Sequence, residues 1–278
     1  MLDAGESPVY RRFFPHSCDK RRRGNHMQAI ALTDQGQLRA YNEDSTTFLR
    51  NHLDEYLVIV ADGMGGHQAG DVASALAVES LEISWKDEKA GFRPGRAEAW
   101  LLHTIRKANE TILAFSKEKP EYAGMGTTLV AAVCTNEFIT IGHVGDSRAY
   151  LFGDRVLDQK TSDHSLVNEL VKSGQLSEEE AEDHPRKNVL LRALGTDDDV
   201  KVDVHTFEWD EHEAALFCSD GLTNKVSDSD LEKVMNSEGS LKEKATELIR
   251  LANEAGGEDN ITVAIIENSS ASGSESSC

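Results

Sequence analysis

The chain has 278 residues, of which 39% are hydrophobic, so it can bury the core of one or two domains. Its formal net charge of −20 argues against general binding to nucleic-acid phosphates. No apolar run approaches the roughly 18 residues that span a bilayer, which disfavours a membrane-anchored receptor. We therefore expect neither a nucleic-acid partner nor a membrane partner.

The two ends of the chain differ from the part between them. Residues 1–26 hold six Lys or Arg against three acids, without the apolar segment of a secretory signal. We expect a disordered arm there, or an upstream start with Met27 as the initiator; a docking arm for an acidic partner is the unsupported alternative. Residues 269–278 are nearly all Ser, Gly, Ala and Glu and are expected to form a disordered tail.

The cysteines Cys18, Cys134, Cys218 and Cys278 show no paired spacing. Two of them lie in apolar, strand-like runs, which indicates reduced core thiols rather than disulfides or a zinc site. A reducing cytoplasm is the simplest compartment for such a chain.

From Met27 onward, strand-like runs alternate with amphipathic helices. The apolar patterns predict strands at residues 28–32, 56–61, 127–135, 137–144, 148–152, 201–207, 214–219 and 261–266. They predict helices at residues 71–85 and 97–117, and a third helix that opens with a Ser240/Glu243 capping box and stops at Gly256. This order fits an α+β layered domain better than a doubly wound parallel sheet.

Three predictions are specific enough to test in detail. In the helix at residues 71–85, the expected core contacts are Val72, Leu76, Val78 and Ile83. Between residues 127 and 152, short turns separate three strands, which predicts successive antiparallel hairpins. The polar stretch at residues 163–195 is expected to be partly helical, with a second capping box at Ser177.

Acidic residues recur where the strand-like runs begin or end. The run before Asp62 is followed by three glycines within four residues, and the other four acids are Asp44, Asp146, Asp220 and Asp259. Carboxylates on strand ends can converge in space and bind hard divalent cations through oxygen. For any one of them alone, the alternative is a carboxylate that caps a turn.

Taken in order, these motifs resemble those of the metal-dependent protein phosphatases of the protein phosphatase 2C type (the PPM family), and look most like its small bacterial members. The resemblance covers roughly residues 27–267. The matching pieces are Thr33-Asp34-Gln35-Gly36, Arg39 to Asp44, Val60 to His67, Gly124 to Thr128, Val144 to Arg148, Asp163-His164-Ser165, His184 to Asn188, Ser219-Asp220-Gly221 and Asp259-Asn260.

The resemblance implies a four-layer α-β-β-α sandwich, with two antiparallel sheets flanked by helices and the acids at one end. Residues 27–268 would form the phosphatase catalytic domain. Residues of about 160–195 would form a mobile flap that shapes substrate choice. Within the flap, His164 and His184 are expected to order the segment through hydrogen bonds rather than to bind metal.

The resemblance also implies hydrolysis of phosphoserine and phosphothreonine by direct attack of a water or hydroxide that bridges two metal ions. The cofactors would be Mn²⁺ or Mg²⁺, two or three per chain. Asp62 would bridge two ions and the Gly63 carbonyl would bind one of them. The remaining ligands would be Asp44, Asp220 and Asp259, with Asp146 at a more weakly held third ion.

Arg39 is the candidate phosphate clamp, because a guanidinium grips two phosphate oxygens in a planar fork. Its alternative is an ordinary ion pair, for instance with Glu43. Many eukaryotic members carry a histidine, a proposed general acid, where this chain has Met64. His67 could stand in for it, or could cap the following helix, so the general acid stays open.

As partners we expect phosphorylated proteins, with a serine/threonine kinase and its substrates, and a monomer by default. Two other functions remain: a non-catalytic phosphoprotein-binding module of the same fold, and a metal-dependent phosphohydrolase of small phosphoesters. No cysteine lies in a Cys-x₅-Arg arrangement, which disfavours a cysteine nucleophile.

Overall fold

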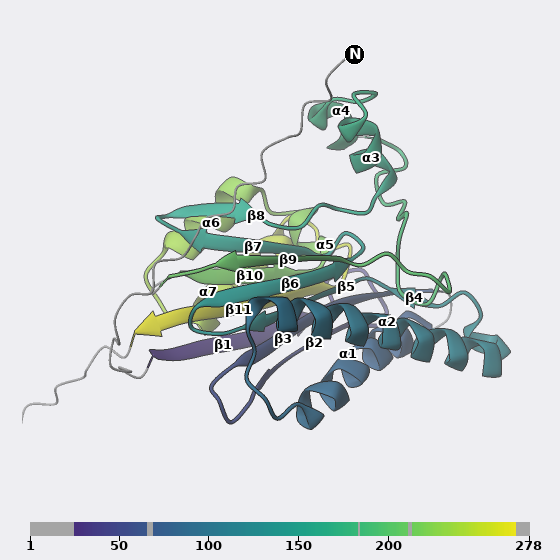
Figure 1. Ribbon diagram of the computed structural model, residues 1–278. Coiled ribbons are helices and arrows are strands. Elements are labelled where there is room, and N and C mark those ends of the chain that lie inside the picture. The colour runs from purple at the N-terminus through teal and green to yellow at the C-terminus, as the bar shows by residue number, and fades with distance from the viewer. Residues whose placement is uncertain (1–24, 66–68, 183, 211–212, 271–278) are drawn as a thin grey trace, which may run out of the picture.

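Two antiparallel sheets packed face to face form the centre of the structure (Figure 1). The computed structural model describes residues 25–65, 69–182, 184–210 and 213–270. The first sheet has the order β1 (Asn25–Asp34), β11 (Ile261–Ser270), β10 (Ala214–Cys218), β7 (Arg148–Gly153) and β8 (Val156–Gln159). The second has the order β2 (Asp44–Arg50), β3 (Tyr56–Met64), β5 (Leu129–Cys134), β6 (Phe138–Val144) and β9 (Asp203–Glu208), with β4 (Gly126–Thr127) paired to β3.

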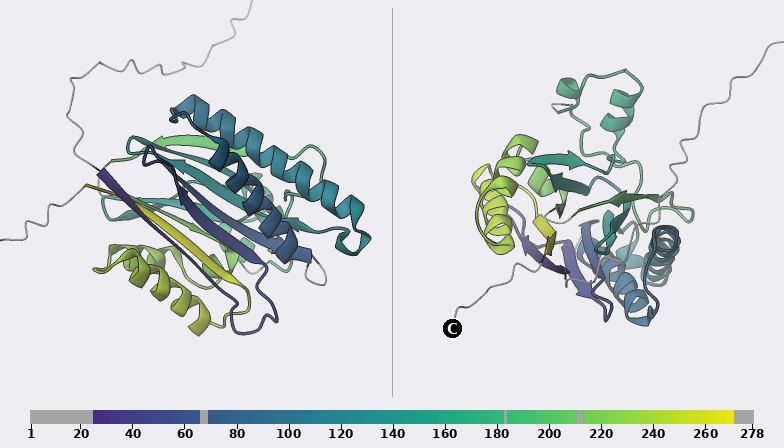
Figure 2. Two further views of the ribbon diagram at one scale, coloured as in Figure 1. Left: turned by 90° about the horizontal axis from the view of Figure 1, so that it is seen from below. Right: turned by 60° about the vertical axis from the view of Figure 1, so that its left-hand side comes forward.

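Helices cover the outer face of each sheet (Figure 2), which confirms the expected α-β-β-α order. The second sheet packs against α1 (Ala69–Asp87) and α2 (Pro94–Glu118), which is followed by the 3₁₀ turn η1 (Pro120–Tyr122). The first sheet packs against α6 (Asp228–Asn236) and α7 (Leu241–Glu254), with the short α5 (Asp220–Thr223) before them. No helix of the described residues is long and apolar enough to cross a membrane.

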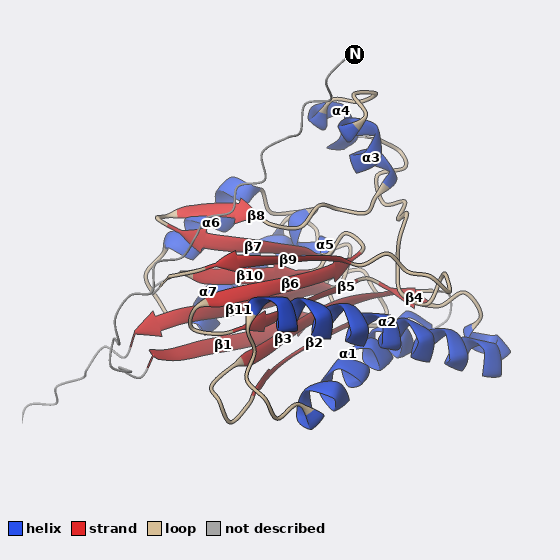
Figure 3. Ribbon diagram, viewed as in Figure 1, coloured by secondary structure: helices blue, strands red, loops and turns tan. Residues whose placement is uncertain are grey.

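The flap stands apart from the sandwich. Its helices α3 (Leu166–Lys172) and α4 (Glu178–Glu182) project beyond β8, and long loops join them to the sheets (Figure 3). The predicted capping box forms at α4, where the Ser177 amide donates to Glu180 at 2.9 Å and the Glu180 amide donates to the Ser177 hydroxyl at 3.2 Å. The second capping box, at Ser240, opens α7 as predicted.

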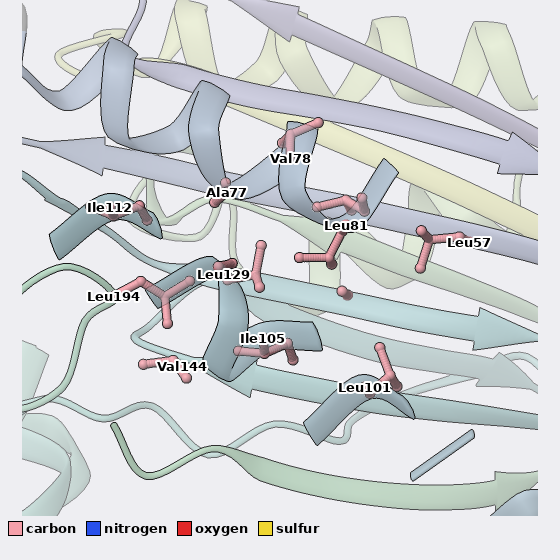
Figure 4. Close-up of a cluster of buried hydrophobic side chains, with 14 of the residues drawn as sticks. Leu57, Ala77, Val78, Leu81, Leu101, Ile105, Ile112, Leu129, Val144 and Leu194 are labelled. Carbon is pink, nitrogen blue, oxygen red and sulfur yellow. The ribbon is translucent and has the colours of Figure 1, made fainter. Parts of the chain in front are cut away.

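Strand β3 is covered on both faces, which explains why its sequence is an unbroken apolar run. Leu57 and Ile59 point to the layer under α1 and α2, whereas Val58 and Val60 point to the other sheet. All four are almost fully buried. Burying each such side chain contributes roughly 1.5–3 kcal/mol to the stability of the fold. Figure 4 shows the layer under the helices, in which Leu57, Leu81 and Leu101 lie close together.

The predicted core face of α1 is partly wrong. Val78 is buried, and Val72 and Leu76 are partly buried against the same core cluster, but Ile83 is 50% exposed. The buried stripe instead recurs every fourth residue: Ala69, Ala73, Ala77, Leu81 and Trp85. Small alanines let the helix approach the sheet closely, so the face that packs carries little of the apolar signal.

The predicted hairpins hold only in part. Strands β5 and β6 pair antiparallel, with Leu129 opposite Val144, but β6 and β7 belong to different sheets. The chain changes sheet at Gly145, whose φ of +105° suits glycine and whose added Cβ would lie 2.6 Å from the Thr128 side chain. Strand β6 then pairs with β9 instead, so the prediction of successive hairpins is wrong at this junction.

The sequence patterns did not single out β2, β8, α5 or α6. Among the predicted core thiols, Cys134 and Cys218 are buried and free, and burial raises the pKa of Cys218 to about 12. Cys18 and Cys278 lie outside the described residues.

Candidate metal centre and active site

Strand ends from both sheets meet at one end of the sandwich and bring the predicted acids together. In the β2–β3 register, Asp44 is the cross-strand partner of Asp62. In the other sheet, Cys218 at the end of β10 pairs with Arg148 at the start of β7 and with Val263 near the start of β11. The other acids lie just beyond those three strand ends: Asp146 and Asp259 in loops, and Asp220 as the first residue of α5.

The acids raise one another's pKa values. Burial is the main cause for each, and it raises the pKa of Asp44 to about 7 and of Asp146 to about 8. Burial together with the charges of Asp44 and Asp220 holds the pKa of Asp62 well above its ordinary value. The pKa of Asp220 is raised as well, by burial and then by Asp259. Four carboxylates are therefore held where their ionised forms are unfavourable.

This arrangement fits bound divalent cations. Within the described part of the chain, no ion pair involves Asp44, Asp62, Asp146 or Asp220, so their charge is not neutralised by a basic side chain. No three of their carboxylates bring ligand oxygens within 4.8 Å of one another among those residues, which is unlike a single compact cation site. Carboxylates spread over a shared centre suit more than one hard cation, with water and backbone oxygens completing each shell.

Hydroxyl groups orient Asp62 from the neighbouring strands. The Asp62 amide donates to the Thr128 hydroxyl at 3.0 Å, and the Thr128 amide donates back to the Asp62 carbonyl at 2.8 Å. The Thr128 hydroxyl also lies 2.7 Å from the hydroxyl of Ser147, next to Asp146. Thr128 and Ser147 lie in the quoted motifs, but nothing in the sequence indicated this link between the two sheets.

Hydrogen bonds fix the position of Asp44, and close backbone packing fixes that of Gly63. The Ser219 hydroxyl donates to Asp44 Oδ2 at 2.8 Å and in turn accepts the Thr262 amide at 3.0 Å. At Gly63, an added Cβ would lie 2.0 Å from the Gly70 carbonyl and 2.5 Å from that of Glu43. Only glycine fits there, which keeps the Gly63 backbone beside the acids.

Arg39 lies at the rim of this centre. Its Nη2 donates to Asp259 Oδ2 at 2.7 Å, and its Nε donates to the Glu258 carbonyl at 3.2 Å. Its ion-pair partner is therefore Asp259 and not Glu43. The Arg39 side chain is 46% exposed, so the guanidinium stays accessible to a ligand.

A groove of about 750 Å³ runs from the acids to the flap. It is lined by Asp146 and Asp220, by Val171 and Lys187 of the flap, and by Val226, just before α6. Most of the residues that line it are polar, and the apolar ones are Val167, Val171, Ala181 and Val226. Its size and its position beside the acids suit an extended stretch of polypeptide.

The base of the flap is tied to the loop that carries Asp146. His164 Nδ1 accepts the Gly145 amide at 3.1 Å, and the His164 amide donates to the Gly145 carbonyl at 3.0 Å. Next to it, Asp163 forms a two-pronged ion pair with Arg148, at 2.8 Å for the shortest contact. His164 thus makes ordering hydrogen bonds as expected, whereas the His184 ring, within the described residues, accepts one hydrogen bond, from the nearby Arg186 amide.

His143, His164 and Asp203 form a second cluster of possible ligands, within 4.8 Å of one another. The two imidazoles are stacked 4.6 Å apart and nearly parallel, so their lone pairs lie in separate planes and do not converge on one ion. Arg192 Nη1 lies 3.2 Å from both His164 Nε2 and Asp203 Oδ1. The positive charge beside Asp203 is therefore this guanidinium. The cluster is a hydrogen-bonded link between the flap and β9.

His67, the candidate general acid, lies outside the described residues. The other candidate residues named from the sequence are all described, and they gather at one end of the sandwich.

Residues 37–262 match the family model described as protein phosphatase 2C. The chain is 47% identical to the "Serine/threonine phosphatase stp" of Listeria monocytogenes serotype 4b (strain F2365), over 87% of this chain and 96% of that protein.

Solved structures of similar proteins share the fold. The S. agalactiae serine/threonine phosphatase superposes with a TM-score of 0.82 at 40% identity, over 87% of this chain and 99% of that one. The catalytic domain of the serine/threonine phosphatase PstP, solved with two manganese ions, gives a TM-score of 0.76 at 36% identity, over 87% and 97%. With its fold, its strand-end acids and a family match across most of its length, this chain belongs to the protein phosphatase 2C family.

Proposed function

We propose that the acidic end of the sandwich is the active site at which this chain, a serine/threonine protein phosphatase, hydrolyses phosphoserine and phosphothreonine. The observation that carries the assignment is the convergence of carboxylates whose ionised forms the fold disfavours. Such a cluster weakens the fold unless cations bind to it, so a functional reason for keeping it is required.

The residues that would hold Mn²⁺ or Mg²⁺ are those at the strand ends. Asp62 would bridge two ions beside the Gly63 carbonyl, with Asp44, Asp220 and Asp259 around them and Asp146 at a weaker third site. When bound, the ions neutralise phosphate charge and lower the pKa of a coordinated water. The manganese in the PstP structure supports this choice of metal.

Arg39 would bind the phosphate from the rim. Its ion pair with Asp259 holds the guanidinium beside the acids while leaving it 46% exposed. A planar fork of donors can then grip two non-bridging oxygens of the phosphoryl group and align it with the centre. We assign Arg39 to substrate binding and to stabilising the charge on the transferred phosphoryl group.

The groove beneath the flap would receive the polypeptide on either side of the phosphorylated residue. Asp146 and Asp220 in its lining place the phosphate near the acids, and Lys187 and Val171 of the flap also line it. This geometry favours phosphoproteins over small phosphoesters, because a sugar phosphate would leave most of the groove unused.

The leaving oxygen of serine or threonine needs a proton. His67 remains our candidate for that role, and a coordinated water is the alternative. We further propose that the substrates are those of a serine/threonine kinase, and that the protein works as a monomer in the cytoplasm.

The direct test is phosphate release from a phosphothreonine peptide with Mn²⁺, with Mg²⁺ and with a chelator. We expect release with either metal, none with chelator, and much slower release from a sugar phosphate. A folded protein that releases no phosphate but binds the peptide would instead be a phosphoprotein-binding module.

A further inference from the structure

The loop that carries Arg39 packs little hydrophobic surface against the rest of the chain. Residues 35–43 form neither helix nor strand, and the large apolar side chains Leu38 and Tyr41 are 71% and 59% exposed. Hydrophobic packing therefore contributes little to the position of this loop. Something else must hold it if Arg39 is to meet a phosphate reproducibly.

One buried side chain supplies three of the hydrogen bonds that hold the loop, whose backbone is also bonded to Gly257 and Gly63. Asn260, which is 4% exposed, lies just before β11. Its Nδ2 donates to the Gln35 carbonyl and to the Tyr41 carbonyl, both at 2.9 Å, and its Oδ1 accepts the Glu43 amide at 2.8 Å. A single amide thus bonds to the beginning, middle and end of the loop.

The same segment also holds the Arg39 side chain. The residues just before Asn260 supply both of its acceptors, the Glu258 carbonyl and the Asp259 carboxylate. The backbone is tight as well, since a Cβ at Gly36 would lie 2.1 Å from the Asp259 carbonyl. The short segment of residues 258–260 therefore holds both the 35–43 loop and the Arg39 side chain.

We infer that Asn260 is a positioning residue for the phosphate clamp: it fixes the 35–43 loop so that the Arg39 guanidinium faces the acids. The inference rests on the proposed role of Arg39. Replacing the amide releases the loop, so the guanidinium is no longer held where it meets the phosphate, and substrate binding weakens while the acids stay in place.

The test compares Asn260→Asp and Asn260→Ser with a matched control, Asn268→Asp. Asn268 is also buried, and its Nδ2 also donates to two backbone carbonyls, those of Asn136 and Asp210 at 3.2 Å, but it lies near the other end of β11. The aspartate removes the donors and adds a charge, whereas the serine removes them without one. All three variants are measured for thermal stability, for kcat and KM on a phosphothreonine peptide, and for inhibition by inorganic phosphate.

We expect both Asn260 variants to raise KM and the inhibition constant of phosphate by about tenfold or more, with kcat changed far less. Asn268→Asp should lower stability and leave KM unchanged. A purely structural role for Asn260 would lower stability in the same way without moving KM or phosphate inhibition, and that result would overturn the inference.

Arg39→Met separates this inference from the proposed function. If Arg39→Met leaves KM and phosphate inhibition unchanged, the clamp assignment itself is wrong. If it raises both and Asn260→Ser does not, only the positioning role fails. If Asn260 acts through Arg39, Asn260→Ser has little further effect in the Arg39→Met background, and additive effects would contradict this.

Discussion

At the scale of single residues, Asp62 shows how function and stability oppose each other. Its carboxylate faces Asp44 and Asp220, and its pKa is raised because burial and those charges disfavour ionisation. At neutral pH the folded protein must nevertheless carry it ionised for it to bind cations. The unfolded chain bears no such cost, so the acids weaken the fold whenever cations are removed.

We therefore predict that Asp62→Asn stabilises the metal-free protein. With chelator at pH 8, the free energy of unfolding should rise by about 1 kcal/mol or more, because a crowded charge is lost. Urea unfolding of the two proteins measures this difference. A variant less stable than the parent under these conditions would show that Asp62 is a structural carboxylate.

Arg39 permits a second prediction at this scale. Arg39→Lys keeps the positive charge but loses the planar fork, so kcat/KM on a phosphopeptide should fall by about tenfold or more. The melting temperature should hardly change, since the ion pair with Asp259 is exposed and such pairs contribute about 0–1 kcal/mol. Full activity in Arg39→Lys would mean that only charge matters there.

Individual site residues were predictable where their signal was repeated. Asp62, Asp146 and Asp220 each follow an apolar run, and the motif order then pointed to one family. Their supporting partners were not predictable. Ser219 meets Asp44 across 175 positions of sequence, and no local pattern encodes a hydrogen bond between such distant residues.

At the scale of elements, the flap depends on the chemistry at its base. His164 Nδ1 accepts the Gly145 amide, so we assign the proton of the neutral ring to Nε2, which lies 3.2 Å from Asp203 Oδ2. Burial and then the adjacent His143 lower the pKa of His164 to about 4. A second proton would have to displace the Gly145 amide.

This gives a pH dependence with a defined sign. The pKa of His164 is lower in the folded protein than its ordinary value of about 6.5, so the unfolded chain binds the proton more tightly. The contribution to stability is present above about pH 6.5 and is lost as the pH falls towards 4, by at most about 3 kcal/mol. His143, Asp203 and Arg192 face the ring and set this range.

The measurement is urea unfolding of the parent and of His164→Asn between pH 7.5 and 4.5. Asparagine can still accept the Gly145 amide but does not titrate, so the gap between the two proteins should shrink as the pH falls. A gap that stays constant would show that His164 has the same pKa in the folded and the unfolded protein, which would contradict the lowered pKa.

Other elements show why local patterns mislead. The packed face of α1 is built on Ala73 and Ala77, and larger apolar residues flank it. Strand β2 begins at Asp44 and is half-buried at a sheet edge, so it lacks a clear alternation. The change of sheet at Gly145 depends on its close approach to Thr128, which lies between β4 and β5.

At the scale of the whole molecule, the sandwich brings distant loops to one place. Each layer could be anticipated from the resemblance, and the unbroken apolar run of β3 agrees with its burial between the helices and the other sheet. The convergence of the acids follows from register, because antiparallel pairing places Asp44 opposite Asp62 and sets the end of β10 beside the starts of β7 and β11.

The measurement that tests the central claim most directly is calorimetric titration of Mn²⁺ into the protein, paired with phosphate release from a phosphothreonine peptide. Both are made on the parent, on Asp62→Asn and Asp220→Asn, and on the control Asp198→Asn, an exposed acid that pairs only with Lys117 among the described residues.

We predict at least two bound ions and metal-dependent turnover in the parent and in the control. In Asp62→Asn and Asp220→Asn, bound Mn²⁺ should fall and turnover should drop by about 100-fold or more, with the fold intact. Unchanged Mn²⁺ binding and turnover in both variants would contradict the assignment of the metal centre.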